Sequence, residues 1–191
     1  MKKLLAILIL IFIFQTPSQA DDIRDFQIEG MSIGNSLLDF FSEEKIKKLE
    51  KAFHPKSKKF YMITPYKKYE LYEAVTFSLK SKDKDYKIYQ LKGLMPYDNK
   101  LNECLEEKDK ILKEVSNILK NSKEENYTNN FKGAVGKSIA YISDFKVSNG
   151  SIRVWCTDWD KKTEKEKNWI DTLNVDASSQ KYLDWLNNEA Y

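Results

Sequence analysis

The 191-residue chain has little histidine and cysteine, and this shortage argues against several kinds of catalytic site. His54 is the only histidine, so a serine–histidine–aspartate triad would have to use it, and no Gly-x-Ser-x-Gly elbow accompanies it. Two cysteines and one histidine make a zinc centre or a cysteine nucleophile unexpected. No P-loop, GxGxxG or HExxH motif occurs. We therefore expect no cofactor and no metal, and we interpret His54, beside Pro55, as an exposed loop residue.

The chain also lacks an apolar run long enough to span a bilayer, which takes about 20 residues. Its longest run, Leu4–Phe14, follows Lys2 and Lys3 and precedes the small residues of Ser18–Ala20. This order is typical of a secretory signal peptide. We expect residues 1–20 to be cleaved after Ala20, leaving residues 21–191 as a single domain in the periplasm or outside the cell. A membrane anchor is the alternative.

Neither sign of charge dominates the chain. It has 32 basic and 29 acidic residues, and the net charge of +3 falls to +1 once Lys2 and Lys3 are removed with the signal. A nearly neutral chain of mixed charge gives no argument for nucleic-acid binding. We expect a solvated surface and no nucleic-acid partner.

The two cysteines, Cys104 and Cys156, predict a disulfide, because exported proteins meet an oxidising environment. Such a bond would close a loop of about 52 residues and stabilise the fold by about 4 kcal/mol in the chain-entropy model. Two free buried thiols and an intermolecular bond are the alternatives.

The clearest structural signal is the segment Lys137–Trp159. Apolar and polar residues alternate along it on both sides of Asn149-Gly150. Period-2 alternation around an Asn-Gly pair predicts a β-hairpin with a type I′ turn, whose two central residues both need positive φ.

The rest of the chain predicts an α+β fold with a mostly antiparallel sheet and helices packed on one face. Helical signals begin at Ser32 and Ser42, run through 99–120 and reappear after Ser178. We interpret 121–132 as a loop and 161–167 as a charged connection. The expected order of elements is ααβββ-αβββ-α, with the strands outside the hairpin at 60–63, 69–80, 86–95 and 169–177.

All four tryptophans lie in the last 37 residues, and one of them, Trp159, lies between Asp158 and Asp160, next to Trp155. Paired carboxylates can perform acid–base chemistry or bind calcium, and tryptophans can stack on sugars. Asp171 could join the group if the strands pair. The alternative is a strand end with solvated acids and core tryptophans. The candidate ligand surface is Trp155, Asp158, Trp159 and Asp160.

The segment 45–68 is rich in lysine and interleaved with aromatic residues. Such a segment could make weak contact with anionic lipid headgroups at a membrane surface. A solvated helix face and loop is the alternative. The candidate contact residues are Lys56, Lys58, Lys59, Lys67 and Lys68.

The segment Phe26–Leu38, together with Cys104 and Cys156–Trp159, resembles a group of small exported bacterial proteins of unknown function. In addition, Ile28–Ser32, ahead of two short helices, is similar to the opening of the small outer-membrane assembly lipoproteins and of β-lactamase-inhibitor-like domains. That likeness covers about the first 70 residues after the signal, and the lipid-attachment cysteine of the lipoproteins is absent. Neither resemblance implies an activity or a site residue.

The function we expect is that of a non-catalytic, periplasmic protein-interaction domain that binds another envelope protein. The alternative is an envelope hydrolase or carbohydrate-binding protein that uses Asp158, Asp160 and the neighbouring tryptophans. The sequence predicts neither the partner nor the oligomeric state.

Overall fold

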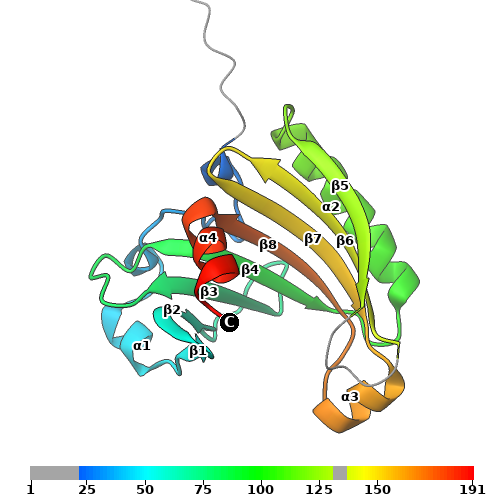
Figure 1. The fold of residues 1–191 in the computed structure, drawn as a ribbon, viewed down its shortest axis with the longest axis horizontal. Helices are drawn as coiled ribbons and strands as arrows, with labels where there is room; N and C mark the ends of the chain where they lie inside the picture. Colours follow the sequence, from blue (N-terminus) through cyan, green and yellow to red (C-terminus); the bar gives the residue numbers. More distant parts are fainter. Residues whose placement is uncertain (1–21, 131–136) are drawn as a thin grey trace, which may run out of the picture.

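The computed structural model describes residues 22–130 and 137–191 (Figure 1). The predicted signal peptide lies outside the described residues. Within them, eight strands form one antiparallel sheet in the order β1-β2-β3-β4-β8-β7-β6-β5. The predicted α+β class with an antiparallel sheet is confirmed. The strands are β1 (Ala52–His54), β2 (Ser57–Ile63), β3 (Ala74–Lys80), β4 (Ile88–Pro96), β5 (Lys123–Asn130), β6 (Ile139–Val147), β7 (Gly150–Asp158) and β8 (Thr172–Ser179).

The helices fall before, between and after these strands, in roughly the predicted order. Two short 3₁₀ helices precede the first α-helix. Among the described residues, no helix has the length and apolar character needed to cross a membrane. The helical elements are η1 (Ile23–Asp25), η2 (Leu37–Asp39), α1 (Glu43–Lys48), α2 (Leu101–Ile118), α3 (Lys161–Lys167) and α4 (Gln180–Asn188).

One face of the sheet packs against α2 and the N-terminal segment. Because side chains alternate along a strand, Ile152, Val154 and Cys156 of β7 all point to this face and are fully buried. Cys104 lies in the first turn of α2 and is bonded to Cys156, with the two Cα atoms 6.1 Å apart. The predicted disulfide is therefore confirmed, and it ties α2 to the centre of the sheet.

Helix α4 lies against the opposite face. Its buried residues Tyr182 and Trp185 pack on Phe60 of β2. The next residue, Tyr61, belongs to the core on the α2 face, so Phe60 points to the opposite face. Ser179 ends β8 and caps α4, so the chain turns directly from strand into helix. The expectation of helices on one face holds for α2, whereas α4 occupies the other face. Figure 1 shows α4 and α3 at opposite ends of β8.

The predicted hairpin is present, but its turn lies one residue earlier. Val147 pairs with Gly150, so Ser148 and Asn149 form the loop. Asn149 has a φ of 67°, whereas Gly150 lies in β7 without a positive φ, so the type I′ prediction was wrong. Gly150 serves a different need, because an added Cβ would lie 2.2 Å from the carbonyl oxygen of Ser178.

Two segments without an apolar pattern have regular structure. The predicted loop after α2 contains β5, which pairs with β6 along its whole length although most of its side chains are exposed. The charged connection at 161–167 is helix α3, capped by Asp160 and spanned by lysine–glutamate pairs. The helix predicted from Ser32 is reduced to η2.

Candidate functional site

The candidate site begins as a row of side chains on the sheet face opposite α2. Strand register places Leu94, Asn174, Trp155, Ile142 and Tyr127 side by side, one from each of β4, β8, β7, β6 and β5. Trp155 is half-buried, and Tyr127 at the sheet edge is exposed. The row therefore presents aromatic and aliphatic surface across the sheet.

Two further tryptophans close one end of this row. Trp159 follows β7 directly, and Trp169 lies between α3 and β8, so α3 brings the two indoles together with their ring centroids 4.6 Å apart. With Trp155 they line a pocket of about 410 Å³, which we call the tryptophan pocket. Trp169 and Ile170 at its rim are each 45% exposed. Its lining residues are Lys92, Leu94, Trp155, Thr157, Trp159, Asn168, Trp169, Ile170, Thr172 and Asn174.

Asp160 and Asp171 do not line the pocket but accept hydrogen bonds from the backbone of segments next to it. Asp160 accepts the N–H of Lys162 at 3.0 Å and so caps α3. Asp171 is buried, and its two oxygens accept the N–H of Trp159 at 2.7 Å and the N–H of Asn99 at 3.2 Å. Each carboxylate accepts hydrogen bonds from backbone N–H groups near a tryptophan, and these bonds hold the backbone that carries the indoles.

Asp158, the last residue of β7, also lies outside the pocket lining. Burial, together with the charge of Asp171, raises the pKa of Asp158 above its ordinary value. The structure therefore brings Trp155 and Trp159 of the predicted ligand surface into one pocket, but places Asp158 and Asp160 outside it. A hydrolase acting on a ligand in the pocket would need carboxylates facing the ligand, and none of the lining residues that the structure describes carries one.

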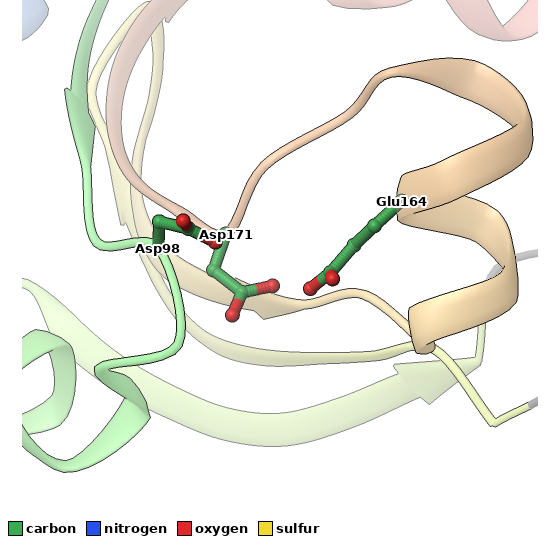
Figure 2. Close-up of side chains that lie close together, drawn as sticks. All are labelled: Asp98, Glu164 and Asp171. Atoms are coloured by element: carbon green, nitrogen blue, oxygen red, sulfur yellow. The ribbon is translucent and has the colours of Figure 1, made fainter.

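Three acidic side chains gather beside the pocket, from the β4–α2 connection, from α3 and from the segment before β8. Figure 2 shows the carboxylates of Asp98, Glu164 and Asp171, whose closest oxygens lie within 4.8 Å of one another. Oxygen ligands at this spacing suit a hard cation. Here the ammonium of Lys161 lies 2.9 Å from both oxygens of Glu164 and supplies the opposing charge. Together with the backbone N–H groups that donate to Asp171, these contacts connect the β4–α2 connection, α3 and the segment before β8.

A charged row separates the tryptophan pocket from α4. Register aligns Lys92, Asp176, Arg153 and Asp144 on neighbouring strands, and Arg153 donates to Asp144 at 2.7 Å. Asp176 is buried and accepts from Gln90 at 2.6 Å. Burial raises the pKa of Asp176, and nearby Lys92 opposes that rise. Lys92 thus faces both the charged row and the pocket.

The predicted lysine surface is divided by the fold. Lys56, Lys58 and Lys59 lie at the start of β2, whereas Lys67 and Lys68 follow its end. A strand rises about 3.3 Å per residue, so the two groups lie roughly 20 Å apart along β2. Lys59 is also paired with Glu189 at 2.7 Å. The structure does not gather these lysines, and membrane contact stays a prediction.

His54 is not the exposed loop residue that was predicted. It ends β1, and its half-buried ring contacts Trp185 and Tyr191 edge-on, each with centroids 5.1 Å apart. Burial lowers the pKa of His54 below its ordinary value. This packing gives the imidazole a structural position near the C-terminus, away from the tryptophan pocket.

Sequence reasoning did not assign Lys92, Asn174 and Trp169 to the site. Lys92 and Asn174 lie on β4 and β8, and only the strand order brings β4 next to β8. The available signal was the clustering of all four tryptophans near the C-terminus. Comparison of the chain with models of protein families, with curated proteins and with solved structures finds no match. The function must therefore be argued from the site itself.

Proposed function

We propose that this protein is a non-catalytic, exported interaction domain and that the tryptophan pocket is its binding site. The observation that carries the proposal is the convergence of three indoles, from β7 and from both sides of α3, on one open pocket. Tryptophan contributes large, rigid contact area and is enriched among residues that dominate binding energy. The volume of about 410 Å³ lies in the range of ligand pockets.

The lining supports binding in preference to catalysis. Of the ten residues in the described part of the chain that line the pocket, none is an aspartate, glutamate, histidine or cysteine. Most general acid–base and nucleophilic groups in enzymes are of these four types, and a threonine nucleophile needs an adjacent base to activate it. The nearby carboxylates of Asp160 and Asp171 are engaged by backbone N–H groups.

Export is part of the same proposal. It is supported by the signal-like sequence of residues 1–20 and by the disulfide between Cys104 and Cys156, a bond that forms and persists in oxidising compartments. An envelope component is therefore the expected ligand.

The test is photocrosslinking in cells that export the protein. A benzophenone amino acid replaces Trp169 at the rim of the pocket, and the matched control carries it at Tyr66, which is 92% exposed on the loop between β2 and β3. Benzophenone inserts into C–H bonds, so it captures peptides and glycans alike. We expect one recurrent adduct from position 169 and none from position 66. Equal labelling at both positions, or no adduct at 169, would overturn the proposal.

A further inference from the structure

We propose that the ligand of the tryptophan pocket is a saccharide that is neutral or acidic. This inference rests on the proposed function above and adds the chemical class of the ligand. It depends on three features of the lining: flat indole walls, an uncharged polar floor and a single cation.

The indoles favour a ligand with flat apolar faces. The rings of Trp159 and Trp169 are inclined by 49° and form an angled wall beside Trp155. The C–H faces of a pyranose ring can pack against such surfaces while its hydroxyls stay free to hydrogen-bond. A small inorganic anion would gain nothing from these walls, because it has no apolar surface to remove from water and the ring faces do not attract negative charge.

The floor supplies polar groups at fixed positions. Thr157, Thr172 and Asn174 stand on β7 and β8 and are each less than 10% exposed. The amide of Asn174 donates to the hydroxyl of Thr172 at 2.9 Å, which orients both side chains. Hydroxyls and amides donate and accept hydrogen bonds without charge, and sugar hydroxyls do the same.

The same floor distinguishes a saccharide from an apolar protein anchor. If a leucine or phenylalanine of a partner filled the pocket, the polar groups at its base would lose water without gaining hydrogen bonds. Leaving buried polar groups unpaired costs free energy for each group. A saccharide can pair with them while still covering the indoles.

The charge of the lining selects among saccharides. Among the lining residues within 22–130 and 137–191, Lys92 is the one that carries a charge. An aromatic site for an ammonium ligand would attract the cation through its ring faces, but Lys92 repels it and no lining carboxylate balances the charge. Acidic sugars should therefore bind at least as well as neutral ones, and amino sugars with free ammonium groups should bind least.

The test is a glycan array that spans neutral, acidic and cationic sugars, probed with the exported protein. Titration calorimetry then measures affinity for trimers of N-acetylglucosamine, galacturonic acid and glucosamine, or for the best glycans on the array. We expect acidic and neutral glycans to bind and cationic ones to be disfavoured.

Variants locate the binding and check the roles of the residues. Trp169→Ala should weaken binding about tenfold or more, a loss typical of an aromatic anchor, whereas Trp169→Phe should retain part of the affinity. Thr157→Val removes a hydroxyl but keeps the shape, so a loss of affinity in this variant would show that hydrogen bonding to the floor contributes. Tyr66 is highly exposed and does not line the pocket, so Tyr66→Ala should leave the affinity unchanged.

The outcomes separate this inference from the proposed function. If no glycan binds but crosslinking at position 169 captures a protein, the pocket is a binding site and the saccharide inference is wrong. If cationic glycans bind most tightly, or Trp169→Ala binds glycans as well as the unaltered protein, the inference is also wrong. If neither glycan binding nor a crosslink is found, both proposals fall.

Discussion

The face of the sheet under α2 and the face opposite it come from the same strands but have different surroundings. Along β7 and β8, the α2 face carries Ile152, Val154, Leu173 and Val175, which are 0% exposed and belong to one apolar core. The opposite face carries charged, hydroxyl, amide and indole side chains, with α4 at one end and the tryptophan pocket at the other.

This difference suggests that stability and binding are assigned to separate faces. Alternation along a strand lets each residue serve one face without affecting the other. The α2 face gains free energy from apolar burial and from the disulfide. The opposite face carries polar side chains that pair across strands, such as Gln90 with Asp176 and Arg153 with Asp144, and leaves three indoles beside an open pocket. Changes on the α2 face should therefore lower stability with little effect on binding, and changes in the pocket should do the reverse.

The largest expected effect is loss of the disulfide. The paired change Cys104→Ser and Cys156→Ser should lower the free energy of unfolding by about 2–5 kcal/mol, because the unfolded chain regains the freedom of the 52-residue loop. Urea denaturation measures this loss, and the unaltered protein in reducing agent is the matched comparison. Where the variant is still folded, its glycan affinity should be unchanged. A large loss of affinity under those conditions would break the separation between the faces.

The second prediction compares one apolar side chain from each region. Ile152→Ala on the α2 face should lower stability by about 2–5 kcal/mol, because it opens a cavity in the core. Trp169→Ala should cost less than about 1 kcal/mol, since Trp169 is 45% exposed, although it is the larger side chain. Denaturation and calorimetry on both variants should give opposite rankings for stability and for affinity. Equal stability losses would mean that the pocket is part of the core.

The third prediction separates a capping role from a catalytic role for Asp160. Asparagine caps helices about as well as aspartate, so Asp160→Asn should change stability by less than about 0.5 kcal/mol and leave binding intact. Asp160→Ala removes the acceptor of the Lys162 N–H and should cost about 1 kcal/mol, with weaker binding because α3 positions Trp159 and Trp169. If the asparagine variant lost function while remaining folded, the charge of Asp160 would matter in its own right.

The sequence predicted those parts of the fold in which an apolar period is clear. The hairpin of β6 and β7, helix α2 and the disulfide were predicted because each has its signal within a short window or in the chemistry of two cysteines. Strand β5 was missed because its side chains are mostly exposed and its structure comes from backbone pairing with β6. The turn was misplaced because Gly150 is needed for close approach to Ser178, a contact between strands that local sequence does not encode.

Only the part of the site whose residues are close in sequence was predicted. Trp155 and Trp159 are neighbours in the sequence, and their chemistry drew attention to them. Lys92 and Asn174 reach the pocket only because β4 lies beside β8 and β8 beside β7, a strand order that follows from packing the whole chain. The acids next to the tryptophans gave the catalytic alternative in the sequence, and in the fold Asp160 and Asp171 accept hydrogen bonds from backbone N–H groups.

The smallest predicted effect concerns His54, which packs with α4 on the face opposite α2. Burial against Trp185 and Tyr191 lowers its pKa, so the folded state favours the neutral imidazole. As pH falls, the unfolded chain therefore binds a proton at His54 before the folded chain does. The contribution of this site to stability is complete above the unfolded pKa of about 6.5 and is lost as pH falls through the folded pKa.

His54→Phe keeps an aromatic ring but cannot titrate. We therefore expect the stability of the unaltered protein, measured by urea denaturation, to fall more between about pH 8 and about pH 5.5 than that of the variant. Because His54 is the only histidine, the difference between the two pH profiles isolates this residue. Parallel profiles would mean that the imidazole is equally solvated in the folded and unfolded states, and that its packing against α4 does not link stability to pH.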